Sequence, residues 1–113
     1  MEHIKIYNTG KWKRFRQSIM KRDRYLCQYH LRYGRSVPAD VVHHIFPTDE
    51  YPELFFNPYN LISLSAKAHE LMHHRDIKTI TIEGQRLQEK VRQQVFEYQD
   101  KLMSNIDTDT NTD

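Results

Sequence analysis

Four histidines and one asparagine in the middle of the chain have the chemistry and spacing of a catalytic metal site. They are His43, His44, Asn60, His69 and His73. Successive side chains alternate across a strand, so the adjacent His43 and His44 would point to opposite faces. His69 and His73 are four residues apart, which places two side chains on one face of a helix. A strand packed on that helix would therefore gather three imidazoles around one divalent ion, with the fourth close by.

This combination suits the hydrolysis of a phosphodiester. The reaction needs an activated water, neutralisation of charge on the phosphate, and help for the departing 3′ oxygen. A divalent ion supplies the last two, and a histidine that titrates near neutral pH can take the proton from water. We therefore assign His43, which would face the helix, to the metal, and His44 to the role of general base.

Asn60 calls for a different role. It stands just before a predicted strand, where a side-chain amide can bond backbone groups on the far side of a loop. We expect Asn60 to hold the loop between the two strands, and so to fix the direction of His44, rather than to ligate the ion directly.

The elements that position these residues follow from apolar periodicity and from breaking residues. A strand is expected over 40–46, ended by Pro47, and a second over 61–64. Ser65 is the expected N-cap of a helix running to about His74. Amphipathic helices are expected from Lys11 to about Arg22 and from about Glu83 to Met103, whereas 1–7 and 25–35 show no regular pattern. The expected fold class is α+β.

Length and composition predict one small globular domain. The chain has 113 residues, 38% of them hydrophobic and 12% aromatic, which is too apolar for a disordered chain. We expect the domain to span 1–103, with its core at about 40–74, and the polar, acidic segment 104–113 to be a disordered tail. No signal peptide and no apolar run of roughly 20 residues is present, and the single cysteine excludes an internal disulfide. We therefore expect a cytoplasmic protein without membrane contact.

Basic residues are concentrated in the N-terminal third. From Lys11 to Arg35 there are nine Lys or Arg and one acid, whereas from Ser36 onward thirteen acids face seven Lys or Arg. Such a segment is typical of a surface that binds a polyanion, although a solvated helix face would have the same composition. The histidines downstream favour DNA. Candidate phosphate contacts are Arg14, Arg16, Lys21, Arg22, Arg24 and Arg35.

The segment from Trp12 to His74 resembles the HNH endonuclease family, especially small phage-encoded members associated with terminase. The similar stretches are KWKRFRQSIMKRDRYLCQYH, ADVVHHIFP, NPYNLISLS and AKAHELMHH. The resemblance implies a ββα-metal finger, in which two strands, a loop and a helix surround one divalent ion. The finger would be flanked by the basic N-terminal helix and the amphipathic C-terminal helix.

The resemblance also implies a role for each site residue. In that family the first residue of the His-His pair is a ligand, the second is the general base, and a later helix residue is again a ligand. These positions match His43, His44 and His69 here. The asparagine matching Asn60 orients the loop, and His73 matches an additional ligand of the colicin-type nuclease domains. The products would carry 5′-phosphate and 3′-hydroxyl ends.

One departure from the family pattern concerns a structural zinc. Many such enzymes hold it with two Cys-x-x-Cys pairs, but here the pairs are Cys27 with His30 and Ser65 with Ala68. Alanine cannot ligate, and a structural zinc needs four N or S donors. We therefore expect no structural zinc, with Cys27 as a small buried residue.

The sequence predicts a divalent-metal-dependent endonuclease acting on DNA. Its ion is one of Mg²⁺, Mn²⁺, Ni²⁺ or Zn²⁺, since histidine-rich ligation does not discriminate among them. By analogy with the phage members, terminase subunits and the portal are expected partners, with the host cytoplasm as the location. One alternative is a nucleic-acid-binding subunit that keeps the finger without cutting, and another is a structural zinc protein. The sequence leaves oligomeric state and sequence specificity open.

Overall fold

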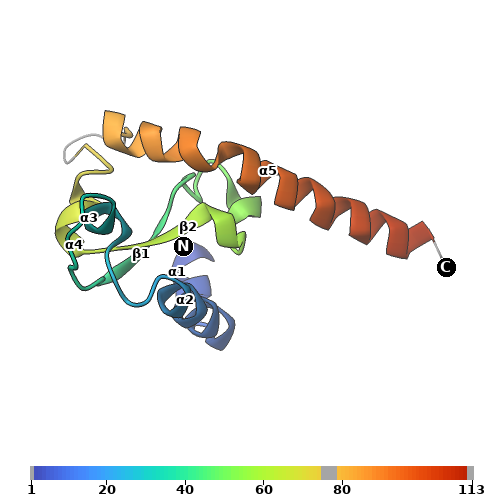
Figure 1. Cartoon of the computed structure of the whole chain (residues 1–113). Coiled ribbons are helices and arrows are strands. Elements are labelled where there is room, and N and C mark those ends of the chain that lie inside the picture. Colours follow the sequence, from blue (N-terminus) through green and yellow to red (C-terminus); the bar gives the residue numbers. More distant parts are fainter. Residues whose placement is uncertain (1, 75–78, 112–113) are drawn as a thin grey trace.

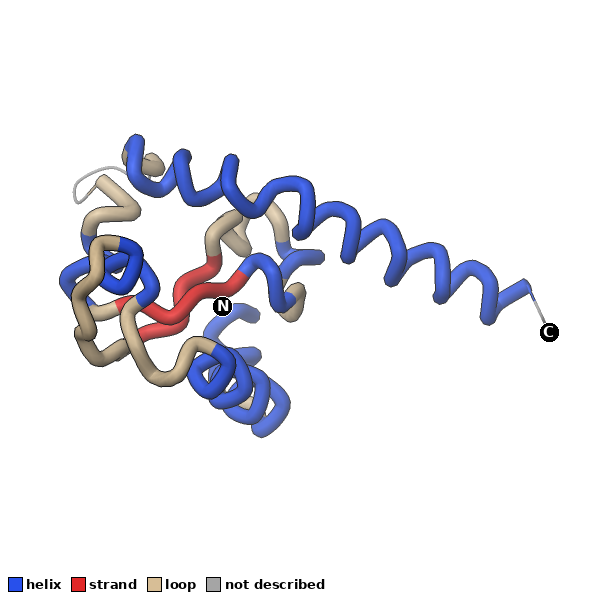
Figure 2. Tube along the Cα trace, viewed as in Figure 1, coloured by secondary structure: helices blue, strands red, loops and turns tan. Residues whose placement is uncertain are grey.

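A two-stranded antiparallel sheet lies at the centre of the chain, with helices packed around it (Figures 1 and 2). This computed structural model describes residues 2–74 and 79–111. The elements are α1 Glu2–Tyr7, α2 Gly10–Arg22, α3 Gln28–Arg32, β1 Val41–His44, η1 Pro52–Leu54, η2 Pro58–Asn60, β2 Leu61–Leu64, α4 Ala66–Glu70 and α5 Ile82–Asn111, where η marks a 3-10 turn. The predicted α+β class is confirmed.

The sheet separates two hydrophobic clusters. His43 pairs with Ile62 and His44 with Leu61, so the two histidines point to opposite faces, as their adjacency predicts. On the His43 face lies a cluster that includes Phe46, Leu54, Leu64, Ala68, Met72, Leu87 and Val95. On the His44 face lies a smaller cluster of Trp12, Ile19, Phe55 and Leu61. Each histidine is therefore built into its own packed environment.

α1 and α2 cover the His44 face, where Ile6 of α1 and Trp12 and Ile19 of α2 join the smaller cluster. Thr9 is the N-cap of α2, and its hydroxyl accepts a hydrogen bond from the Trp12 backbone N–H at 3.2 Å. Trp12 and Ile19 point inward and are buried. The sequence did not predict α1 or α3, which have six and five residues, because helices of fewer than two turns show too little periodicity to be recognised.

The helix that carries His69 is shorter than predicted. α4 begins after Ser65, whose hydroxyl accepts from the Ala68 N–H at 3.1 Å, and it ends at Glu70 rather than near His74. Beyond it the backbone turns to pair with residues 79–81, through His74 N–H to Thr79 O at 2.9 Å and Thr81 N–H to Met72 O at 3.2 Å. These non-helical bonds replace the continuation of the helix.

The last helix covers the larger cluster and then extends past the body of the molecule (Figure 1). The side chains of Leu87 and Val95, on one face of α5, are buried in this cluster, in agreement with the predicted amphipathic helix. The structure continues α5 to Asn111, in contrast to the predicted disordered tail, and residues 112–113 lie outside the described part. Extending an existing helix adds one hydrogen bond per residue, and no Pro or Gly follows Gly84 to interrupt it. Among the described residues, no helix is long and apolar enough to cross a membrane.

Candidate active site

Three histidines from separate elements converge at one end of the sheet. His43 lies on β1, His69 on α4, and His73 beyond α4 in a backbone bridge with Ile80. One ring nitrogen from each can be chosen so that all three lie within 4.8 Å of one another. The ring centroid of His43 lies 4.9 Å from that of His69 and 5.2 Å from that of His73.

The surroundings of His43 and His69 favour the neutral form of their rings. His43 is 4% exposed, and burial lowers its pKa well below the ordinary value, with the neighbouring His69 and His73 lowering it further. Burial also lowers the pKa of His69. A neutral imidazole is the form that binds a metal.

The three histidines therefore fit a divalent ion. Metal–nitrogen bonds of about 2.0–2.1 Å place two ligands of one ion no more than ~4.2 Å apart. The observed upper limit of 4.8 Å between the ring nitrogens lies close to this spacing. Imidazole donors suit several ions, Ni²⁺ and Zn²⁺ among them, so the donor set does not single out one ion.

His44 is held between aromatic rings on the other face of β1. Its ring stacks on Trp12 at 5.4 Å and 24°, and it contacts Phe55 with a centroid distance of 4.7 Å. Its Nε2 lies 3.1 Å from the Phe55 carbonyl oxygen. An Nε2–H that donates to this carbonyl leaves the imidazole lone pair on Nδ1. Packing and tautomer thus give His44 one defined orientation.

Asn60 makes the loop-holding contacts expected of it. Its Oδ1 accepts from the Phe46 N–H at 2.7 Å, and its Nδ2 donates to the carbonyls of Phe46 at 3.1 Å and Leu54 at 3.3 Å. Asn60 is fully buried. It therefore connects the end of β1 to the segment that supplies the Phe55 carbonyl.

The four histidines open onto a shared cavity of about 230 Å³, here called the histidine cavity. Its other walls are Tyr7, Val42 and residues 47–49. Tyr7 is a site residue that sequence reasoning missed. It precedes His43 by 36 positions, and no motif spacing links a residue in an unrecognised helix to a site so far along the chain.

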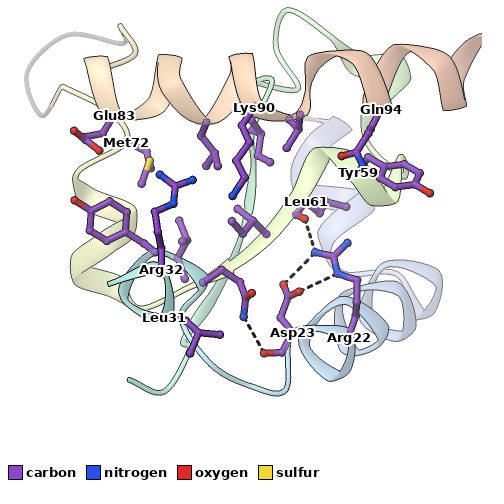
Figure 3. Close-up of a pocket in the computed structure, with 17 residues that line it drawn as sticks. Arg22, Asp23, Leu31, Arg32, Tyr59, Leu61, Met72, Glu83, Lys90 and Gln94 are labelled. Carbon is purple, nitrogen blue, oxygen red and sulfur yellow. Dashed lines mark hydrogen bonds and ion pairs between the residues drawn. The ribbon is translucent and has the colours of Figure 1, made fainter. Parts of the chain in front are cut away.

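The six basic candidates differ in their surroundings. Arg14, Lys21, Arg24 and Arg35 are exposed, and Arg16 donates to the Asp40 carbonyl at 3.0 Å. Arg22 differs from the other candidates, because its guanidinium donates to Asp23 and to the Leu61 carbonyl (Figure 3), and also to the Pro58 carbonyl. These bonds make Arg22 a structural residue.

The Arg22–Asp23 pair borders a second, larger cavity of about 460 Å³ between α3, β2 and α5 (Figure 3). The Asp23 carboxylate also accepts from the Ser63 N–H at 2.9 Å. Together the pair satisfies backbone groups along the open edge of β2. Arg32 and Lys90 line the same cavity, and none of the four histidines lines it.

Cys27 and Ala68 belong to the same buried cluster, and each is 0% exposed. Cys27 is therefore a small core residue, as predicted. At the position where a second Cys-x-x-Cys pair would end, Ala68 packs as part of the hydrophobic core.

Comparison with known proteins found structural similarity to a solved structure. No protein-family model and no curated protein matches the chain. The structure is similar to the crystal structure of the HNH endonuclease of the deep-sea thermophilic bacteriophage GVE2 with manganese ion. The TM-score is 0.59 at 29% sequence identity, over 61% of this chain and 75% of that chain. The chain is thus a small α+β domain whose fold resembles that of a phage HNH endonuclease.

Proposed function

We propose that this chain is a divalent-metal-dependent HNH endonuclease that hydrolyses phosphodiester bonds of DNA. The observation that carries the proposal is the placement of the four histidines. Three gather their nitrogens within 4.8 Å, and His44 lines the same cavity in an orientation fixed by Trp12 and the Phe55 carbonyl. The likeness to an HNH endonuclease crystallised with manganese supports the same reading.

In this proposal His43, His69 and His73 hold the ion. When bound, the ion would neutralise charge on the phosphate and stabilise the 3′ leaving oxygen. Because His43 is buried and its pKa is lowered, it presents a neutral imidazole without first losing a proton at neutral pH.

His44 acts as the general base. With Nε2–H donating to the Phe55 carbonyl, its Nδ1 takes a proton from the attacking water, and the imidazolium that forms keeps its Nε2 bond. Trp12 and Phe55 prevent the ring from turning. Asn60 positions the loop that carries this carbonyl.

DNA would be held by the basic residues of the N-terminal third. Arg14, Arg16, Lys21, Arg24 and Arg35 remain candidates for phosphate contacts, which position a duplex without reading its sequence. The helix that carries three of them, α2, packs on the same face of the sheet as His44. We exclude Arg22 from this set because its bonds are internal.

A biological setting is proposed on resemblance alone. The similar structure is a bacteriophage enzyme, so we assign this chain to phage DNA packaging or processing in the host cytoplasm, with terminase subunits and the portal as partners. Co-purification of the tagged chain with the large terminase subunit tests this assignment independently of the chemistry.

The activity is tested with supercoiled plasmid incubated with the chain and Mg²⁺, Mn²⁺, Ni²⁺ or Zn²⁺ in turn. We expect nicked or linear plasmid with at least one ion, and no cleavage when EDTA is in excess. Plasmid that is shifted in a gel but never cut with any ion would contradict the proposal and favour the non-cleaving DNA-binding subunit. Unfolding on chelation without cleavage would favour a structural zinc protein.

A further inference from the structure

Tyr7 stands apart from the other residues that line the histidine cavity. Those others come from residues 42–49 and 69–73, which belong to the sheet, its loop and the segment of α4. Tyr7 comes from α1 at the far end of the sequence, and among the side chains that the structure describes in that helix it alone lines the cavity. A role at the site would therefore explain what the short α1 provides.

The position of the Tyr7 ring is defined by the rings that hold His44. Tyr7 packs edge-on to Trp12 with a centroid distance of 5.2 Å and contacts Phe55 at 5.3 Å. Trp12 and Phe55 are the rings that flank His44, and the Tyr7 centroid lies 6.3 Å from the His44 centroid. Tyr7 and the proposed base thus form one aromatic unit beside the cavity.

The hydroxyl of Tyr7 is arranged to keep its proton. Burial raises the pKa of the phenol, the Asp49 carboxylate raises it further, and a side-chain hydrogen bond with Thr48 lowers it in part. A tyrosine whose net pKa is raised is neutral at neutral pH and can donate its proton in a hydrogen bond. Tyr7 and Thr48 both line the wall of the cavity.

The cavity has few other groups that could donate to an anion. Among the residues that the structure describes, no Lys or Arg lines it, and the charged residue in its wall is the acidic Asp49. The side-chain donors apart from the histidines are the hydroxyls of Tyr7 and Thr48. A phosphodiester bound there gains charge on its non-bridging oxygens during attack by water, and a fixed donor aimed at that charge speeds the reaction.

We propose that the Tyr7 hydroxyl donates a hydrogen bond to a non-bridging oxygen of the scissile phosphate, which makes Tyr7 a substrate-contacting residue of the cleavage site. The inference rests on the proposed nuclease function. It extends the site from the metal finger to the N-terminal helix.

Tyr7→Phe tests this proposal, because it removes the hydroxyl and keeps the ring that packs on Trp12 and Phe55. The matched control is Tyr98→Phe on α5, since Tyr98 is 36% exposed against 39% for Tyr7 and lies outside the cavity. Each variant is compared with the wild-type chain on duplex DNA and on bis(4-nitrophenyl) phosphate. This small diester presents a reacting phosphate with no neighbouring nucleotides. The Kd for Mn²⁺ and the unfolding midpoint are measured in parallel.

We expect Tyr7→Phe to lower kcat about 10- to 100-fold on both substrates, which is the effect of losing one hydrogen bond to a charged group. The Kd for Mn²⁺ and the unfolding midpoint should stay at wild-type values, and Tyr98→Phe should have wild-type activity.

Unchanged kcat in Tyr7→Phe would overturn the inference and leave the nuclease function intact. A loss on DNA alone would overturn the contact with the scissile phosphate, and weakened Mn²⁺ binding would show that Tyr7 acts only through the fold. A wild-type chain that cleaves neither substrate would instead reject the proposed function, and the inference with it.

Discussion

His43 and His44 are neighbours in the chain, yet their side chains meet different surroundings. His43 is buried against His69 and His73, where a neutral ring is favoured. His44, on the opposite face of β1, stacks on Trp12 with its Nε2 at the Phe55 carbonyl. At the residue scale, the alternation of side chains along a strand is what separates the proposed metal ligand from the proposed general base.

Asn60 offers a test of how the loop supports the base. Asn60→Ala leaves the Phe46 N–H and two carbonyls without their buried partner, so we expect it to lower the free energy of unfolding by about 2–4 kcal/mol. Cleavage should fall as well, because the segment that carries the Phe55 carbonyl is no longer fixed. Urea unfolding monitored by circular dichroism measures the first effect, and plasmid cleavage the second.

The control for this variant is Asn105→Ala on the exposed part of α5, where we expect a change within about 0.5 kcal/mol. If Asn60→Ala unfolds at the same urea concentration as the wild type, the loop-holding role is wrong.

The burial of His43 also makes stability depend on pH. Its pKa is lowered in the folded state from an ordinary value of 6.5, so below that pH the unfolded chain binds the proton more readily than the folded chain. In the presence of a chelator, the free energy of unfolding should be fully retained above about pH 6.5. It should decrease as the pH falls toward the folded pKa, by at most about 1.4 kcal/mol per pH unit for this one group.

Urea unfolding in the presence of a chelator at pH 7.5, 6.5 and 5.5 measures how the free energy of unfolding changes with pH. His43→Leu should flatten this dependence, and His74→Gln, which alters an exposed histidine, should leave it unchanged. Equal slopes in the wild type and in His43→Leu would show that His43 is not the group responsible.

At the scale of elements, the site depends on how short segments are held rather than on their length. α4 has only five residues, and His73 reaches the cluster because residues 72–74 pair with residues 79–81, just before α5. The Arg22–Asp23 pair similarly closes the open edge of the four-residue β2. These backbone hydrogen bonds, and the bonds of the Arg22–Asp23 pair to β2, thus stabilise the short elements of the site.

Gly84, in the first turn of α5, packs closely against Ile80 and the backbone of Met72. A Cβ at Gly84 would collide with the Ile80 side chain and lie 2.6 Å from the Met72 carbonyl oxygen. We therefore expect Gly84→Ala to lower the free energy of unfolding by about 1–3 kcal/mol, although alanine is the better helix former. It should also weaken Mn²⁺ binding, because the displaced backbone carries His73.

Gly10→Ala is the matched control for the effect on stability. The Cβ there would meet only the flexible end of the Arg14 side chain, at 2.9 Å, so we expect no loss of stability. A Gly84→Ala chain that is more stable than the wild type would contradict the close approach at the start of α5.

The sequence was most informative where a residue's position depends on local periodicity. The alternation in β1, the bounds of β2 and the Ser65 cap were predicted because each depends on residues a few positions apart. The end of α4, the internal bonds of Arg22 and the place of Tyr7 were not predicted. Each depends on partners 10 to 40 residues away, such as Leu61 for Arg22, which no local pattern reveals.

On the scale of the whole molecule, two features follow from the arrangement of the helices. The radius of gyration is 15.3 Å and the longest extent is 51 Å, against about 13 Å expected for the radius of a compact chain of this length. The projecting end of α5 accounts for this elongation (Figure 1). Six of the nine Lys or Arg between Lys11 and Arg35 lie on α2, which packs on the His44 face, whereas α5 carries acids interspersed with bases. DNA is therefore expected at the N-terminal side of the body.

The central claim is that His44 removes a proton from water while the other three histidines hold the ion. The most direct measurement compares His44→Ala with His74→Ala, a substitution of an exposed histidine outside the cavity, for both Mn²⁺ affinity and the rate of DNA cleavage. We predict that His44→Ala binds Mn²⁺ with a wild-type Kd and cleaves at least about 100-fold more slowly, whereas His74→Ala behaves as the wild type. Wild-type cleavage by His44→Ala would contradict the account.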